Sequence, residues 1–258
     1  MMGVNHAISG AAAWVLVTST AANFPALSYL HVEPVQMVAG AAVCAGAALL
    51  PDADHHNATI AHSVPIAGRV AAGAAGALTG GHRHGLHSIL AIVGCWFLMG
   101  FIGDVEAFQF TLPWLGVVSV GVPLLVTAAL LCFSLKVLKV AKSWLKAWLI
   151  GSFAAILLNL FFPNELGWFQ LCVTLGFTVH ILGDFLTVEG INWFWPLKLK
   201  APKFVASLPV LNLIWKENGY FSLPILGKTG SIAEYLFALA LGIYAVIGLA
   251  VNVLGLAL

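Results

Sequence analysis

Histidines and aspartates that could bind a metal occur in four short segments far apart in the sequence. The segments are His6, the run PDADHH at 51–56, the run HRHGLHS at 82–88, and the pair His180 and Asp184. Imidazole combined with carboxylate suits Zn²⁺, Mn²⁺ or Fe²⁺, whereas Mg²⁺ and Ca²⁺ prefer shells made of oxygen. If the fold brings these segments together, we expect a divalent-metal site, with zinc as the first candidate and manganese or iron as alternatives.

His180 and Asp184 have the spacing of neighbours on one face of a helix. Residues four apart project from the same side of an α-helix, and Thr187 continues that stripe. An aspartate inside an apolar membrane segment is costly to bury and is by default a functional candidate. A bound cation would neutralise Asp184, and His180 would complete the coordination. The simpler alternative for the pair alone is a structural hydrogen bond.

Asp52, Asp54 and Arg83 are the candidates for catalysis. The two aspartates alternate in a segment that we expect to be extended or a turn after Pro51. Either could bridge two metals, while the other orients a ligand or acts as a general base. Arg83 carries a planar fork that matches the oxygen atoms of a phosphate. His87 is expected at the start of a helix, with its side chain directed back toward the site.

Other polar residues near these motifs have simpler interpretations. Asn5 is expected to cap the first helix, and Glu189 to be a solvated residue beside the membrane. Glu234 lies near the start of the last span, where it would either favour the helix N-terminus or reach the site. His82 could be a metal ligand or a solvated bystander. The histidines expected to include solvated bystanders are His55, His56, His62 and His84.

The composition indicates that lipid surrounds most of the protein. Of the 258 residues, 61% are hydrophobic and only 8% are charged, and the mean hydropathy is +0.99. A soluble domain would carry about 25% charged residues. The net charge of +1 gives no reason to expect a nucleic-acid partner. The four cysteines lie in apolar runs without a CxxC pair, so we interpret them as small buried hydrophobic residues.

Apolar runs predict an all-α, polytopic bundle of about seven membrane spans that forms a single domain over 1–258. A span requires about 20 residues. The predicted spans are 7–24, 34–51, 87–103, 114–135, 145–162, 167–187 and 231–257. The Ala/Gly-rich segment 64–80 is expected to be a short interfacial helix rather than a further span. The segment 188–230 is expected to form a small, irregular cytoplasmic cap.

The basic residues predict the orientation. With the N-terminus on the inner side, every Lys and Arg falls in an inner segment or at an inner helix end, as expected for a membrane protein. The outer side then carries no Lys or Arg. It carries four acidic residues, Glu33, Asp104, Glu106 and Glu165. We therefore expect a multi-pass protein of the inner cell membrane with the N-terminus and all four metal-binding segments on the cytoplasmic side.

Three motifs resemble those of a known family. LLPDADHH resembles an LLPDxDH signature, HRHGLHS resembles HRxxTHS with Leu86 in place of Thr, and HILGDFLTVEGINWFWP resembles HxxxDxxTxxGxxxxxP. Together with a histidine near the first helix, they resemble the YdjM-type, LexA-regulated, membrane-bound metal-dependent hydrolases. That family is similar, more distantly, to zinc-dependent phospholipase C and P1-type nucleases. The metal ligands implied by the resemblance are His6, Asp52, Asp54, His87, His180 and Asp184.

The leading hypothesis is a metal-dependent hydrolase that cleaves a lipid-linked or other membrane-associated phosphoester, with membrane lipids as its surroundings. Arg83 would assist phosphate binding, and Asp52 or Asp54 would accept a proton from water. One alternative is a metal transporter or a metal-binding membrane protein without hydrolytic activity. A transport site usually lies near the bilayer midplane, whereas these polar residues are predicted at one end of the spans. Another alternative is a scaffold whose metal only ties helices together.

Overall fold

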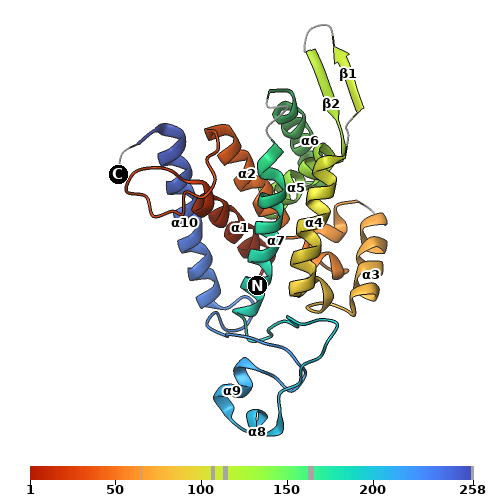
Figure 1. The fold of residues 1–258 in the computed structure, drawn as a ribbon, viewed down its shortest axis with the longest axis vertical. Helices are drawn as coiled ribbons and strands as arrows, with labels where there is room; N and C mark the ends of the chain where they lie inside the picture. The colour runs from red at the N-terminus through yellow and green to blue at the C-terminus, as the bar shows by residue number, and fades with distance from the viewer. Residues whose placement is uncertain (65, 106–107, 113–115, 162–165, 257–258) are drawn as a thin grey trace.

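Apolar helices coincide with the seven predicted spans. The structure is a computed structural model that describes residues 1–64, 66–105, 108–112, 116–161 and 166–256; of the residues used above, Glu106 and Glu165 lie outside these ranges. The helices at the predicted spans are α1 (Gly3–Thr18), α2 (Pro34–Ala47), α4 (Ile89–Asp104), α5 (Val122–Val137), α6 (Trp144–Phe161), α7 (Phe169–Phe185) and α10 (Ile232–Leu254). They form a bundle in which α1 and α2 lie between α10 and the pair α4 and α7 (Figure 1).

Several helices are suited to a membrane by length and composition. Within the described residues, the segments long and apolar enough to cross a bilayer are Pro34–Asp54, Trp144–Phe161 and Ile232–Leu254, and shorter apolar helices are α4, α5 and α7. Their outward faces are rich in hydrocarbon, as shown by Phe97, Phe153 and Leu236, which are each at least 60% exposed. A water-soluble protein would bury such side chains, so these faces are compatible with lipid.

Two predicted spans have different starting points in the structure. The first helix begins at Gly3 rather than near residue 7 and ends at Thr18. Asn23 adopts a left-handed backbone, with φ of 63°, in the loop that follows. At the fourth predicted span, helix α5 begins at Val122 rather than at 114. Pro123 occupies the first turn of α5, where proline is favoured. Residues Gly116–Val120 instead form strand β2, which pairs antiparallel with β1 (Phe108–Leu112). The sequence GVVSV is rich in β-branched residues, and the prediction that helix starts at 114 was wrong.

Helix α2 is the centre of the bundle, and glycine allows its neighbours to approach closely. A Cβ atom at Gly10 of α1 or at Gly176 of α7 would lie 2.5 Å and 2.4 Å from the carbonyl oxygen of Cys44. A Cβ at Gly46 would lie 2.0 Å from the carbonyl oxygen of Leu130 in α5. Small residues at such crossings are the usual means of packing helices in membranes. The four cysteines are free and buried, as predicted.

Short helices surround one end of the bundle. They are the 3₁₀ turns η1 (Pro51–Asp54), η2 (Thr59–His62) and η3 (Gly85–His87) and the helix α3 (Ala67–Thr79). The turn η4 (Leu166–Trp168) lies at the opposite end, directly before α7. The segment predicted to be extended or a turn after Pro51 is therefore one turn of 3₁₀ helix. Helix α3 has 13 residues, too few to span a bilayer, and packs on η1 and η2.

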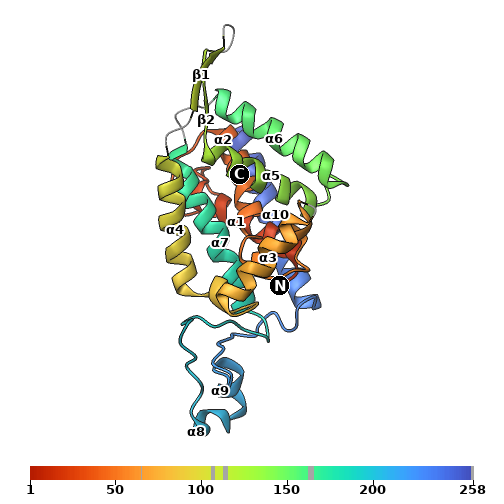
Figure 2. The same cartoon turned by 90° about the vertical axis from the view of Figure 1, so that its right-hand side faces the viewer.

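A cap extends beyond the same end of the bundle, in the segment predicted to be irregular. It contains the helices α8 (Lys203–Ala206) and α9 (Pro209–Ile214). An isolated antiparallel bridge between Ile191 and Phe221 joins the first and last parts of the cap segment. The cap lies at one extreme of the long axis and the β1–β2 hairpin at the other (Figure 2). The candidate site must lie where the bundle meets the cap, because the four polar segments begin or end there.

Candidate metal centre

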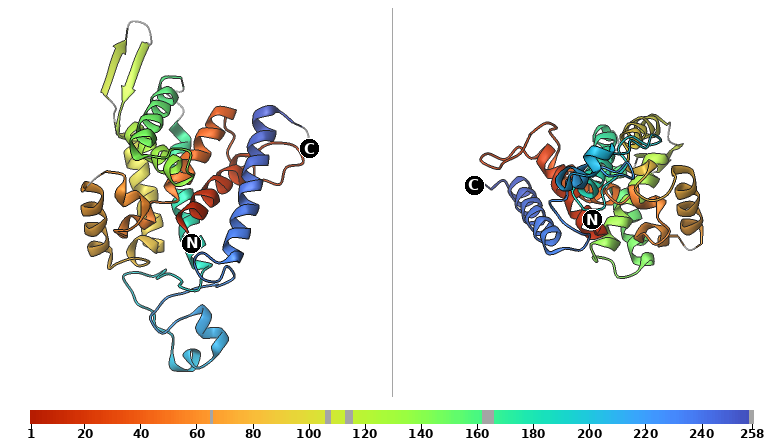
Figure 3. Two further views of the ribbon diagram at one scale, coloured as in Figure 1. Left: turned by 180° about the vertical axis from the view of Figure 1, so that it is seen from behind. Right: turned by 90° about the horizontal axis from the view of Figure 1, so that it is seen from below.

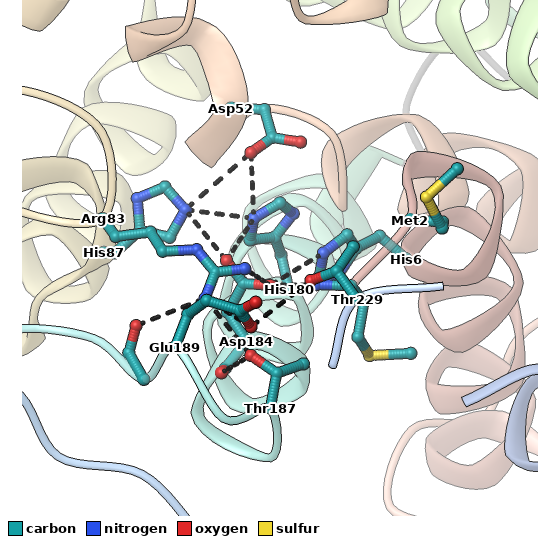
Figure 4. Close-up of polar contacts among 12 residues, drawn as sticks. Met2, His6, Asp52, Arg83, His87, His180, Asp184, Thr187, Glu189 and Thr229 are labelled. Atoms are coloured by element: carbon teal, nitrogen blue, oxygen red, sulfur yellow. Dashed lines mark hydrogen bonds and ion pairs between the residues drawn. The ribbon is translucent and has the colours of Figure 1, made fainter. Parts of the chain in front are cut away.

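The four polar segments meet at the end of the bundle that faces the cap (Figure 4). His6 comes from the first turn of α1, Asp52 from η1, His87 from η3, and His180 and Asp184 from the last turns of α7. The three histidines and Asp184 are at most 1% exposed, although each carries a polar or charged side chain. Burial of this kind requires compensation by hydrogen bonds, opposite charges or a metal.

Four possible ligand atoms lie close to one another at the centre of the cluster. Nε2 of His87 lies 3.2 Å from Nε2 of His180. Oδ1 of Asp52 lies 3.5 Å and 3.9 Å from Nε2 of His180 and of His87, respectively. Oδ2 of Asp184 lies 3.6 Å from Nε2 of His87 and 3.9 Å from Nε2 of His180. A tetrahedral zinc ion with ligands at about 2.0–2.1 Å places them about 3.4 Å apart. The distances of 3.2–3.9 Å among Nε2 of His87, Nε2 of His180 and Oδ2 of Asp184 fit three corners of this geometry with only small adjustments.

Backbone and carboxylate contacts orient two of these histidines. Nδ1 of His180 lies 2.7 Å from the carbonyl oxygen of Ala48, to which it donates when it carries the proton. Nδ1 of His87 lies 3.4 Å from Oδ2 of Asp54. In both rings the partner favours the proton on Nδ1 and leaves the Nε2 lone pair directed at the cluster. Carbonyl and carboxylate partners of this kind are the usual support of metal-binding histidines.

Asp54 is placed behind the cluster rather than within it. Its side chain is fully buried, and its two oxygens face two imidazoles: Oδ2 faces His87, and Oδ1 lies 2.9 Å from Nδ1 of His82. Burial favours the neutral His82 ring, but the carboxylates of Asp54 and Asp52 outweigh it and raise the pKa of His82 above its ordinary value. This geometry is suited to orienting His87, which is one of the roles that the sequence left open for Asp52 and Asp54.

His6 adds a further ligand atom beside Asp184. Its Nε2 lies 3.3 Å from Oδ1 of Asp184, and its ring stacks on that of His180 with centroids 3.6 Å apart. Neither ring nitrogen of His6 has a hydrogen-bond partner within the described structure. Asp184 presents one oxygen to His6 and the other to His87 and His180, an arrangement suited to a carboxylate shared by two metals. Oδ1 of Asp184 also forms an ion pair with the ammonium group of Met1.

The ligand atoms form three overlapping groups. Each group contains atoms within 4.8 Å of one another, and the groups are His6, His180 and Asp184; Asp52, His87 and His180; and Asp54, His82 and His87. Because a neutral imidazole offers one lone pair, His87 and His180 can each serve one metal. This donor set of imidazoles and carboxylates, with buried His6 nitrogens that make no hydrogen bond in the described structure, fits a divalent metal of the zinc, manganese or iron type.

Arg83 lies at the edge of the cluster and faces a pocket. Its Nη2 lies 3.1 Å from Oδ1 of Asp184, and its Nη1 donates to Oγ1 of Thr187 at 3.2 Å. Nη1 also lies 3.5 Å from Oε2 of Glu189, which sequence reasoning treated as a solvated residue. The pocket has a volume of about 410 Å³ and is lined by Asp52 and Asp184 among others. The cluster is therefore accessible to a small polar molecule.

Two further predictions concern Asn5 and Glu234. Asn5 does not cap the first helix, because the N-cap is Met2 and Asn5 lies inside α1. Its Nδ2 donates to Oε1 of Glu234 at 2.5 Å, and the Glu234 carboxylate also accepts from the backbone nitrogens of Met2 and Gly230. Glu234 thus joins the starts of α1 and α10 and belongs to none of the three ligand groups. The sequence gives no local signal of this pairing because 229 positions separate the two residues.

His84 has a partner in the cap. The hydroxyl of Tyr220 lies 2.8 Å from its Nδ1, and burial raises the pKa of Tyr220. This contact joins the 82–88 motif to the cap, so His84 has a structural partner.

The comparisons identify one family. The model of the YdjM inner membrane protein family matches residues 1–134 and 141–254. These ranges include every residue of the three ligand groups. No curated protein and no solved structure matches the chain.

Proposed function

The chain belongs to the YdjM inner membrane protein family, and from this premise we propose that it is a metal-dependent hydrolase that cleaves a phosphoester of a lipid or another membrane-associated molecule. The observation that carries the proposal is the buried set of His87, His180 and Asp184, whose ligand atoms lie 3.2–3.9 Å apart, with Asp52 beside them at an open pocket. A site that only held helices together would have no need of an access route.

The residues around the pocket have roles suited to phosphoester hydrolysis. A divalent metal held by His87, His180 and Asp184 would keep a coordination position open for water, which it would activate, and would stabilise negative charge on a phosphoryl oxygen. Arg83 lines the pocket and offers guanidinium donors toward phosphate oxygens. Overall, water adds to phosphorus, the ester P–O bond breaks, and the alcohol leaves with a proton.

Asp52 is better placed than Asp54 to accept the proton from water. Its side chain is 23% exposed and lines the pocket, whereas the Asp54 side chain is fully buried between His82 and His87. A general base must reach the proton that it removes. We therefore assign proton transfer to Asp52 and the positioning of His87 to Asp54. We assign His6 as a ligand of a second metal.

We further propose that the protein crosses the membrane several times, with the cap and the metal centre on the cytoplasmic side. The cap contains Lys198, Lys200, Lys203 and Lys216, as expected for a cytoplasmic segment. The polar cluster lies at one end of the helices rather than halfway along them, which favours a surface reaction over a path for metal transport.

Metal analysis combined with a phosphate-release assay tests the proposal. The purified protein and the variants His180→Ala and Asp184→Asn are compared for bound zinc, manganese and iron, and for phosphate or phosphomonoester release from lipid phosphoesters. The proposal expects metal and turnover in the wild type and loss of both in the variants. Equal metal content in all three proteins refutes the site. Bound metal without turnover of any phosphoester would instead favour a metal-binding protein.

A further inference from the structure

An apolar groove lies between helices α1, α7 and α10, close to the candidate metal centre. Its volume is about 380 Å³. Small residues of α1, including Ser9 and Ala13, form its floor, while Leu182 of α7 and Leu241 of α10 belong to its two walls. Helix α1 packs against both α7 and α10, which flank it in two opposite views of the bundle (Figures 1 and 3).

The groove and the metal centre share one face of α1. His6, Ser9, Ala13 and Leu16 are separated by three, four and three residues, which places them on one stripe of a helix. The segment from Ser9 to Leu16 extends about 10 Å along the helix axis. The groove therefore starts one turn after His6, the residue that faces Asp184, and continues toward the middle of the helix.

Gly183 connects the groove wall to the cluster. It lines the groove and directly precedes Asp184. A Cβ atom at this position would lie 3.3 Å from Nδ1 of His6 and would meet the Met1 side chain. His6 is 1% exposed, and its ring nitrogens are without hydrogen-bond partners in the described structure. A buried imidazole that faces Asp184 thus borders the inner end of an otherwise apolar groove.

The other side of the groove is open at the outer, apolar surface of the bundle. Leu16, Leu182 and Phe237 form part of its lining and are 39%, 44% and 36% exposed. Phe237 lies in α10, a candidate membrane-spanning helix, and Leu182 lies in α7, a shorter apolar helix. A molecule that enters from the bilayer therefore meets hydrocarbon first and the polar cluster last.

We propose that this groove binds the aliphatic tail of the substrate while its phosphate is held at the metal centre. The inference rests on the proposed function for the phosphate end, and it narrows the substrate to a phosphoester with a long hydrocarbon chain. A soluble phosphoester would use the pocket beside Arg83 but would gain nothing from the groove. Van der Waals contacts between the methylene groups and the groove lining would add to affinity.

Filling the groove tests the proposal without altering the metal centre. Ala13→Phe places an aromatic ring on the groove floor, whereas Ala154→Phe places the same ring in a separate apolar groove lined by residues of α2, α5 and α6. Ala13→Leu is a milder form of the first variant. Thermal unfolding in detergent and zinc content verify that each variant is folded and retains its metal.

Binding of two non-hydrolysable probes, octadecylphosphonate and ethylphosphonate, is measured for each zinc-loaded protein in the same detergent. Ala13→Phe should weaken octadecylphosphonate binding by about tenfold or more, because the ring takes the space of the chain and removes its packing contacts with the groove. Binding of ethylphosphonate should change by less than about twofold. The Ala154→Phe variant should match the wild type with both probes, and Ala13→Leu should be intermediate.

The two proposals fail in different ways. If octadecylphosphonate binds equally to wild type and Ala13→Phe, or if the wild type does not prefer it to ethylphosphonate, the groove inference is wrong even when phosphoesters are hydrolysed. If the chain-length preference is lost in Ala13→Phe but no phosphoester is cleaved by the wild type, the groove inference holds and the hydrolase proposal fails.

Discussion

Replacing Asp54 with asparagine separates a positioning role from a ligand role. The sequence motif implies that Asp54 binds metal, whereas in the structure its oxygens face Nδ1 of His82 at 2.9 Å and Nδ1 of His87 at 3.4 Å. The Asp54→Asn variant keeps the shape of the side chain but removes its charge. It weakens the hold on the Nδ1 proton of His87, while the Nε2 atoms of His87 and His180 remain 3.2 Å apart.

The expected loss is therefore moderate. Removing the carboxylate partner of a metal-binding histidine lowers metal affinity by about 10- to 100-fold, which is about 1.4–2.8 kcal/mol. Saturating zinc should restore the wild-type metal stoichiometry in Asp54→Asn. In His180→Ala, the Nε2 ligand atom of His180 is absent, so saturating zinc should not restore the wild-type metal stoichiometry.

Zinc titration in competition with a chromophoric chelator measures both quantities. The His82→Gln variant is the matched control, because it removes the other imidazole that contacts Asp54 and leaves His87 in place. Thermal unfolding in detergent verifies that the variants are folded. If Asp54→Asn lost the site as completely as His180→Ala at saturating zinc, Asp54 would be a ligand and the positioning argument would be refuted.

Three further outcomes are expected. Gly176→Ala should destabilise the bundle by about 1–3 kcal/mol, because its Cβ would lie 2.4 Å from the Cys44 carbonyl oxygen; unchanged thermal unfolding would contradict the close packing of α7 on α2. Zinc affinity should fall as the pH is lowered below the ordinary histidine pKa of about 6.5, because imidazole binds metal only without its proton; a pH-independent affinity would exclude histidine ligands. Arg83→Lys should raise KM for a phosphoester more than it changes zinc content, because lysine lacks the planar fork; unchanged kinetics would remove Arg83 from the phosphate site.

The convergence of four segments could be predicted from the sequence because it depends on topology. Apolar runs predict where helices lie, and the distribution of basic residues predicts which ends share a side of the membrane. His6, the segment at 51–56, the segment at 82–88 and the last turns of α7 all lie at one end of the bundle in the structure. Whether that end faces the cytoplasm stays a prediction.

Details that depend on distant partners could not be predicted. The carbonyl oxygen of Ala48 orients His180 across 132 positions of sequence, and Glu234 accepts from Asn5 across 229. Asn5 was assigned to a helix cap because local preference was the only guide. The β1–β2 hairpin was missed because its apolar sequence is equally compatible with an extension of the following span.

X-ray absorption at the zinc edge tests the central claim most directly, because it reports the atoms around the bound metal. Zinc-loaded wild-type protein should show nitrogen and oxygen ligands at about 2.0–2.1 Å, with the multiple-scattering pattern of at least two imidazole rings, contributed by His87 and His180. A zinc shell without imidazole, a shell that contains sulfur, or a protein that retains no metal would contradict the account.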